Sequence, residues 1–388
     1  MSVWQDLPGQ AEVVATLSRT AQEGNPTHAW LFTGPPGSGR SNAARAFAAA
    51  LQCQRPEPEQ RGCGECEACR SVLAGTHPDV SMVTTEAVTY AIAEVRQLIG
   101  KAQDRPATGR WRIIITEDAD RMTERTTNVL LKAIEEPPPH TVWILSAPSP
   151  ADVLVTIRSR CRAVSLRVPD VASVTELLVR RDGLTEAQAA FAARVSQGHI
   201  GVARRLARDE GARRRREEIV SLPLQLRSLA DAMSAATRFI EVTTSEAESS
   251  AEERTTADEA RLRTQLGLGP EEIIPPQLRS HFKQLAEDSK RRARRGTTDS
   301  LDRALIDLST FFRDTLTLQL GTQQELVNAH LGQPLHRYSA GTGATHSLAC
   351  IDAIALARRR LAGNVSPAMA VEALMTSLIA SPPGRSQQ

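Results

Sequence analysis

The segment Gly34-Pro-Pro-Gly-Ser-Gly-Arg-Ser41 has the spacing of a phosphate-binding loop, GxxxxGK[ST], with Arg40 at the lysine position. In such loops backbone N–H groups fold around phosphates, lysine reaches the β and γ oxygens, and the hydroxyl, here Ser41, holds magnesium. Arginine keeps the charge, but its planar fork cannot present a compact ammonium at the same point. The pattern predicts a nucleotide-binding frame with impaired hydrolysis, and both a nucleotide-bound and an empty loop stay open. The glycines that would shape the loop are Gly34, Gly37 and Gly39.

A pair of acidic residues follows the hydrophobic run 113–116. ATPases of this type need one carboxylate for magnesium and one to activate water. Glu117 and Asp118 stand at that place in the reverse of the usual Asp-Glu order, which displaces each carboxylate by one methylene group. Alignment of an attacking water is sensitive to errors of about 1 Å. The two residues are also typical of exposed turn acids, but together with Arg40 they indicate a degenerate ATPase site.

Four of the six cysteines fall within 17 residues in the spacing C-x9-C-x2-C-x2-C. Four thiolates brought together by short turns suit tetrahedral Zn²⁺, and Gly62 and Gly64 permit the tight backbone that those turns need. The alternative is a set of reduced cysteines or a redox pair, for which a single CxxC would suffice. We therefore expect a structural zinc site without an open catalytic position. Its ligands would be Cys53, Cys63, Cys66 and Cys69.

The composition predicts a globular chain of two or three domains, because 388 residues with 41% hydrophobic side chains can bury sizeable cores. The net charge of +2 implies no global attraction to nucleic acid or membrane, so any such contact must be local. The first residues lack a basic and then apolar leader, and no apolar run approaches the roughly 20 residues that a bilayer crossing needs. We expect a cytoplasmic protein.

Short β-rich runs alternate with helical stretches up to about residue 166, which predicts a parallel sheet with crossover helices and a ligand site at the carboxyl ends of its strands. This α/β nucleotide-binding-like domain would span residues 1–167 and include the zinc module at 53–69. Helical patterns then predict a small lid domain at 168–210 and an all-α domain at 211–388. The expected strands are Trp30–Thr33, Val80–Val83, Ile113–Thr116, Val142–Leu145 and Val164–Leu166.

The segment 243–296 is rich in charge and alanine and resembles an insertion in the C-terminal helices. It ends in the basic run Lys290-Arg-Arg-Ala-Arg-Arg295. Such a short run is usually a solvated helix face or linker, and the alternative is local contact with DNA phosphates. Aromatic residues make up only 3% of the chain, so the sequence shows no stacking platform for single strands.

Two further segments carry a specific resemblance. Asn128-Val-Leu-Leu-Lys-Ala-Ile-Glu-Glu-Pro-Pro138 and Thr156-Ile-Arg-Ser-Arg-Cys161 resemble the signature of bacterial clamp-loader AAA+ subunits, over residues 1 to about 210. The zinc cysteines are shared by the ATPase and delta prime members of that family. Arg40, the Glu117-Asp118 order, Ala147-Pro148 at the first sensor and Gly201 at the second make the delta prime branch the closest match, since an active ATPase would retain the usual residues.

The resemblance implies that this chain does not hydrolyse ATP itself. It implies that Arg160 is an arginine finger offered in trans to ATP held by a neighbouring subunit; the alternatives are that Arg160 pairs with a surface carboxylate or that Arg158 is the finger. The implied partners are gamma or tau ATPase subunits, a delta subunit, the sliding clamp and primer-template DNA, contacted through phosphates. The C-terminal helices would form the collar of the assembly.

Two other functions remain as alternatives. The first is an active ATPase of gamma or tau type that tolerates Arg40, which turnover by the isolated chain would identify. The second is a zinc-dependent nucleic-acid-binding protein with a vestigial nucleotide fold, which would bind DNA tightly without partners. The near-neutral charge and the few aromatic residues weigh against the second.

Overall fold

The computed structural model describes residues 2–85, 89–363 and 365–379, without the side chains of residues 265, 284, 288 and 291–295. The chain divides into two compact units, Met1–Ala207 and Arg208–Gln388. Among the helices that the structure describes, none combines the length and apolar character needed to cross a membrane.

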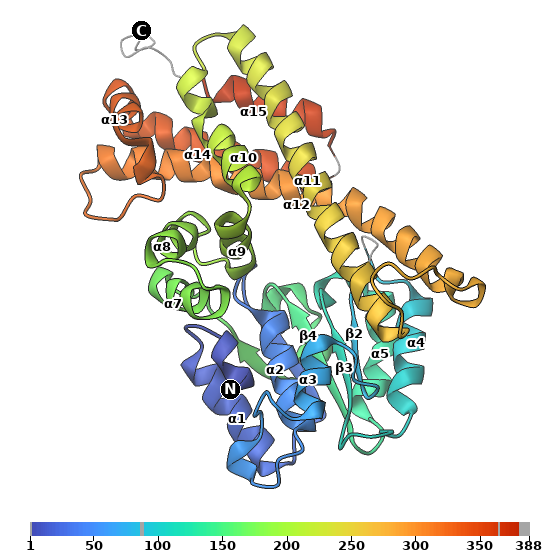
Figure 1. The fold of residues 1–388 in the computed structure, drawn as a ribbon. Coiled ribbons are helices and arrows are strands. Elements are labelled where there is room, and N and C mark those ends of the chain that lie inside the picture. Colours follow the sequence, from blue (N-terminus) through green and yellow to red (C-terminus); the bar gives the residue numbers. More distant parts are fainter. Residues whose placement is uncertain (1, 86–88, 364, 380–388) are drawn as a thin grey trace. The chain divides into compact units, whose positions relative to one another are not determined.

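A parallel five-stranded sheet forms the centre of the first unit, with the order β2-β3-β4-β1-β5 (Figure 1). The predicted parallel sheet with crossover helices is therefore confirmed. After β1 the chain crosses to β2 at one edge of the sheet, and after β4 it crosses to β5 at the other edge. The connections of the neighbouring strands β1 and β4 therefore run in opposite directions, which makes their carboxyl ends the topological switch point where ligands bind in such sheets. The strands are β1 (Ala29–Thr33), β2 (Val80–Val83), β3 (Arg112–Thr116), β4 (Thr141–Ala147) and β5 (Arg162–Ser165).

The last strand departs from its predicted limits of Val164–Leu166. β5 begins at Arg162, which pairs with Trp30 of β1, and ends at Ser165. β5 is an edge strand in which only Val164 is buried. Its first residues therefore lack the apolar pattern by which a strand is predicted from the sequence. Leu166 lies beyond the strand but is buried, and its N–H donates to the carbonyl of Thr33 at 2.7 Å.

Helices cover both faces of the sheet, because alternate strand residues point to opposite sides. Trp30 and Phe32 pack with α1, α2 and α3 on one face, whereas Leu31 and Ile114 pack with α4, α5 and α6 on the other. The helices are α1 (Ala11–Glu23), α2 (Arg40–Gln52), α3 (Glu67–Ala74), α4 (Ile92–Gln103), α5 (Glu124–Glu135) and α6 (Val155–Arg158).

Three helices follow the sheet: α7 (Val171–Asp182), α8 (Glu186–Val195) and α9 (Ile200–Arg208). Asp170 caps α7 and Thr185 caps α8 by accepting hydrogen bonds from the N–H groups of Ser173 and Gln188, which satisfies donors that a helix start leaves free. Most of this region lies in the same compact unit as the sheet. A domain boundary at 167/168 stays a prediction.

The second unit is helical, with a core that includes Phe239, Phe311 and Phe312. The charged segment 243–296 comprises the last part of one long helix, the connection at 266–278 and the first part of a second long helix, and the basic run belongs to the second helix. Side chains 291–295 lie outside the described part, so DNA contact by this run stays a prediction. The helices are α10 (Glu210–Ser221), α11 (Leu229–Gln265), α12 (Arg279–Gln319), α13 (Gly332–Gly341), α14 (Ala344–Ala362) and α15 (Pro367–Ser377).

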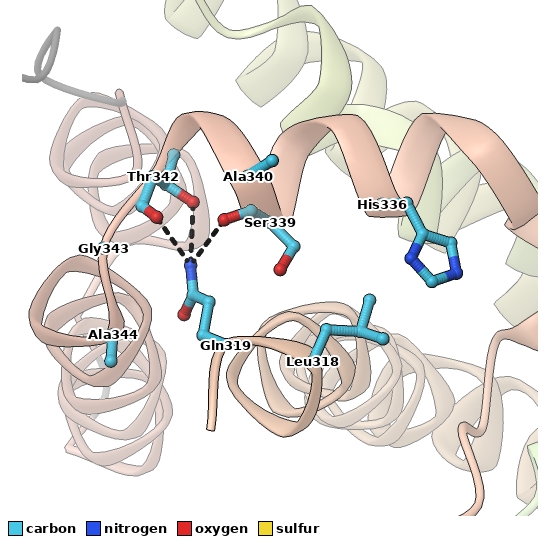
Figure 2. Close-up of a pocket in the computed structure, with 8 residues that line it drawn as sticks. All are labelled: Leu318, Gln319, His336, Ser339, Ala340, Thr342, Gly343 and Ala344. Atoms are coloured by element: carbon cyan, nitrogen blue, oxygen red, sulfur yellow. Dashed lines mark hydrogen bonds between the residues drawn. The ribbon is translucent and has the colours of Figure 1, made fainter. Parts of the chain in front are cut away.

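An open pocket of about 520 Å³ lies where α12, α13 and α14 meet (Figure 2). The amide nitrogen of Gln319 donates to the carbonyls of Ser339 and Thr342 at 3.2 and 3.0 Å, and its oxygen accepts from the Ser347 hydroxyl at 2.9 Å. The Gln319 side chain therefore connects α12 to α13 and α14 and is not a free recognition group for a ligand.

Asp79, directly before β2, holds the loop before β3. Its fully buried carboxylate accepts hydrogen bonds from the N–H groups of Ala107, Thr108 and Gly109 at 2.7–2.8 Å and pairs with Arg112 at 3.3 Å. Asp79→Asn would place an amide NH₂ against N–H donors. We expect a loss of about 3 kcal/mol in the free energy of unfolding, because buried donors would lose their acceptor.

Urea unfolding at neutral pH measures this loss, with Asp104→Asn as the matched control. Asp104 also pairs with Arg112, at 3.2 Å, but its side chain is 68% exposed, so its change should stay below about 0.5 kcal/mol. Equal effects of the two substitutions would contradict the role given to Asp79.

The Asp79 carboxylate also makes the free energy of unfolding depend on pH in the acidic range. Burial raises the pKa of Asp79, but the N–H bonds outweigh it and lower the pKa to about 2. An unfolded aspartate titrates at about 3.9, so its stabilising contribution is complete above about pH 4 and is lost as pH falls through 2. Unfolding of Asp79→Asn should lose this part of the acid dependence.

Candidate functional site

The phosphate-binding loop connects β1 to α2 at the switch point of the sheet. Gly37 and Gly39 have φ values of 89° and 88°, a region that residues with a side chain rarely adopt, and α2 begins at Arg40. The loop therefore places a helix N-terminus at the end of β1, the arrangement that binds phosphate in nucleotide-binding folds.

Arg40 is directed into its own loop. Its Nη1 donates to the carbonyl oxygen of Gly34 at 2.6 Å. Burial lowers the pKa of Arg40, and the negative charges of Asp118, Asp120 and Glu117 oppose that shift. The guanidinium thus binds a backbone oxygen within the loop, where a lysine would extend to the phosphates.

Two residues outside the motif also contact the loop. A Cβ added to Gly37 would lie 2.7 Å from Cγ and 2.8 Å from Cα of His199, just before α9, so His199 packs directly against the loop. Gln10, before α1, donates from Nε2 to the carbonyls of Ser38 and Arg167 at 3.3 and 2.5 Å. Gly201, which the resemblance predicts at the second sensor position, lies in α9.

The acidic residues after β3 point to different partners. Oε2 of Glu117 accepts from the Thr84 hydroxyl at 3.3 Å, whereas Oδ2 of Asp118 pairs with Nε of Arg121 at 3.5 Å. Asp118 also has a left-handed backbone with φ of 51°. Asp120 is a third carboxylate, whose pKa is raised by burial and by Asp118. The structure thus brings Arg40 and the acids into one electrostatic environment.

Arg160 lies just after α6 and is already paired. Its Nη2 forms an ion pair with Oε1 of Glu135, the last residue of α5, at 2.5 Å. Its Nη1 donates to the carbonyl of Thr156 at 2.7 Å and to the Ser159 hydroxyl at 3.3 Å. Arg158 instead donates to the carbonyl of Pro150 at 3.2 Å. A carboxylate partner for Arg160 was one of the sequence alternatives, and the isolated chain contains it.

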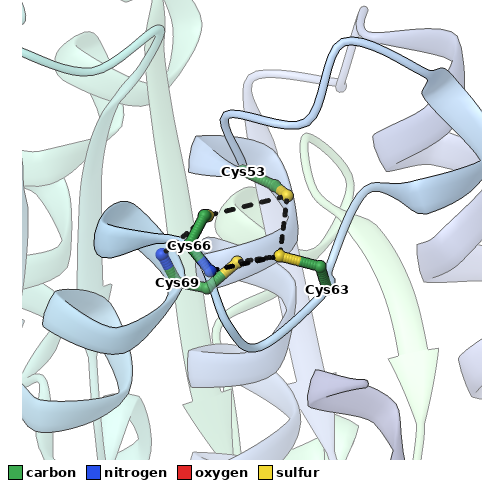
Figure 3. Close-up of side chains that lie close together, drawn as sticks. All are labelled: Cys53, Cys63, Cys66 and Cys69. Atoms are coloured by element: carbon green, nitrogen blue, oxygen red, sulfur yellow. Dashed lines mark hydrogen bonds between the residues drawn. The ribbon is translucent and has the colours of Figure 1, made fainter. Parts of the chain in front are cut away.

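The four clustered cysteines converge on one point (Figure 3). All four Sγ atoms lie within 4.8 Å of one another, a cluster that could hold a metal ion. The N–H groups of Glu65 and Cys66 donate to Sγ of Cys63, and the N–H of Cys69 donates to Sγ of Cys66, all at 3.4 Å. Such donors favour thiolates, the form in which cysteine binds metal.

The electrostatics differ among these thiols. Burial raises the pKa of Cys63, but N–H bonds from Cys66 and Glu65 outweigh it and lower the pKa to about 6. Burial raises the pKa of Cys69. Cys161 is not part of the cluster: it packs against the hydrophobic core beside α5, and burial raises its pKa to about 12.

Sequence reasoning missed the roles of Gln10, His199 and Glu135. Glu135 stands inside the motif Asn128–Pro138, so its position was visible, but nothing in the spacing links it to Arg160. Gln10 and His199 are far from the loop along the chain, and their contacts follow only from the packing of the unit.

The sheet order, the glycine loop before α2 and the cysteine cluster define the first unit as an AAA+ type P-loop fold with a cysteine-rich insertion. Residues 9–170 match the family model described as "DNA polymerase III, delta subunit". This chain is therefore similar to that family over residues 9–170.

Curated relatives fall into two branches. The DNA polymerase III subunit delta' of Pseudomonas aeruginosa is 36% identical over 217 residues, 55% of this chain and 64% of that protein. The subunit gamma/tau of Mycobacterium tuberculosis is 34% identical over 176 residues, 45% of this chain and 30% of that protein. The matches therefore span less than two thirds of these relatives.

Solved structures resemble the fold more distantly. A DNA polymerase III gamma subunit-related protein from Thermotoga maritima aligns over 94% of this chain and 98% of its own, with a TM-score of 0.41 and 14% identity. A RuvB variant from the same organism covers 55% of this chain and 63% of its own, with a TM-score of 0.39 and 18% identity.

Proposed function

We propose that this chain is a non-hydrolysing delta prime type subunit of a DNA polymerase III clamp loader. It supplies Arg160 in trans to ATP bound by a neighbouring ATPase subunit and so helps load the sliding clamp onto primer-template DNA. The resemblance to the delta' protein of Pseudomonas aeruginosa, which reaches furthest along this chain among the relatives described above, supports that branch.

The observation that carries the proposal is the bond from Arg40 to the carbonyl of Gly34. A cationic side chain held inside the loop is not extended toward the β and γ phosphates, where the loop lysine acts in P-loop ATPases. The reversed acids support the same conclusion, because Glu117 and Asp118 contact different protein groups, Thr84 and Arg121.

The partners follow from the clamp-loader role. They are gamma or tau ATPase subunits, a delta subunit, the clamp and DNA, with DNA contacted through phosphates and without sequence preference. The helices of residues 208–388 would supply collar contacts. A replication factor of this kind would work in the bacterial cytoplasm.

The cysteine cluster would hold structural Zn²⁺, because four converging sulfur ligands fill a tetrahedral shell and leave no position for substrate. Cys53 and Cys63 would connect the loop after α2 to the metal, while Cys66 and Cys69 would connect the start of α3 to it. The metal would stiffen the insertion without taking part in ATP chemistry.

The similarity to gamma/tau proteins favours a second candidate, an active ATPase that tolerates Arg40. One experiment separates the two: ATP turnover by the isolated chain and by a loader reconstituted with candidate ATPase and delta subunits, with and without this chain. The proposal is supported if the isolated chain does not hydrolyse ATP and if adding it raises ATP turnover by the assembly in the presence of clamp and primer-template DNA. Turnover by the isolated chain would establish the ATPase instead.

A further inference from the structure

The ion pair between Arg160 and Glu135 joins the two motifs by which the chain resembles clamp loaders. Nη2 of Arg160 faces Oε1 of Glu135 at 2.5 Å, and Nη1 is held by Thr156 and Ser159. The side chains of Arg160 and Glu135 are 37% and 43% exposed. The guanidinium is thus oriented in the free chain while remaining accessible to another molecule.

Guanidinium groups bind phosphate most strongly through two parallel N–H donors. A guanidinium has two edges that offer such a pair, one formed by Nε and Nη2 and the other by Nη1 and Nη2. Both edges include Nη2, the nitrogen that faces Glu135. Nη2 carries one hydrogen on each edge, so a phosphate bound at either edge lies beside the Glu135 carboxylate, and the two negative charges repel each other. Two-point binding of phosphate therefore disfavours the contact with Glu135.

The ion pair is weak enough to exchange. An exposed pair of this kind typically contributes a factor of about 2 to 5 in an equilibrium constant, because water screens the charges. A nucleoside triphosphate carries more negative charge than one carboxylate and offers several oxygens to the guanidinium, so it can replace Glu135 at modest cost.

We propose that Glu135 is a positioning residue that holds Arg160 in the free chain and is displaced from it by a nucleoside triphosphate on an adjacent subunit. This inference rests on the proposed function. Glu135 then lowers the affinity of the assembly for ATP without changing the rate of the chemical step. The reason is that Glu135 opposes phosphate binding to Arg160 equally in the ground state and in the transition state.

The test is Glu135→Gln, which keeps the size of the side chain and removes its charge. In the reconstituted loader, we expect the apparent KM for ATP to fall by a factor of about 2 to 5 with kcat unchanged. Glu136→Gln is the matched control, since Glu136 is the adjacent exposed glutamate at the end of α5, and it should leave both constants unchanged.

The variant is also combined with Arg160→Ala, in which the effect of Glu135→Gln should vanish. A rise in KM, a fall in kcat or no change on Glu135→Gln would overturn the inference, as would an effect that persists without Arg160. If Arg160→Ala itself leaves the assembled rate unchanged, the trans-finger role in the proposed function fails, and the inference fails with it. The two failures are therefore distinguishable.

Discussion

In the proposed assembly, we expect replacement of Arg160 by alanine to slow ATP hydrolysis at the neighbouring ATP site by about 10³- to 10⁵-fold. A guanidinium delivered in trans stabilises the charge that develops on the transferring phosphoryl group, and alanine has no donor to substitute for it. Because the rate of the whole loader includes other ATP sites, the measurement is single-turnover hydrolysis in the reconstituted assembly, where the slow site appears as a separate phase.

Arg158→Ala is the matched control for this prediction. Arg158 lies two residues away at the end of α6, is exposed, and binds the carbonyl of Pro150. It should leave the fast phase intact. A slow phase caused by Arg158→Ala and absent in Arg160→Ala would transfer the finger role to Arg158, while unchanged kinetics in both variants would leave the chain only a scaffold role.

Replacing Cys66 by alanine will weaken metal binding by about two orders of magnitude. Structural zinc sites bind with roughly 10–16 kcal/mol, so one of four thiolates accounts for on the order of 3 kcal/mol. Cys66 also caps α3 by accepting a hydrogen bond from the N–H of Cys69, and its loss should loosen that helix. Metal content after dialysis against a competing chelator, together with proteolysis of the insertion, measures both effects.

Cys161→Ala is the control for the metal site, because Cys161 packs beside α5 and away from the cluster. Its metal content should match that of the native chain. If the native chain instead retained no zinc and formed a disulfide on mild oxidation among the four cysteines Cys53, Cys63, Cys66 and Cys69, that result would contradict the metal site and indicate a redox pair.

Much of the fold was predictable from local pattern. Buried strands such as β3 and β4 are continuous apolar runs between polar turns, so their positions are visible in the sequence. The edge strand β5 was misplaced by two residues at its start because Arg162 and Ala163 are exposed.

The candidate site divides in a similar way. The loop glycines, the cysteine set and Arg160 can be identified as candidate site residues from residue type and short spacing. The contacts of Arg40 with Gly34, of His199 with Gly37 and of Glu135 with Arg160 depend on how the chain packs. Short spacing constrains neighbours along one turn or helix, whereas the direction of a long charged side chain depends on the partners that packing brings to it.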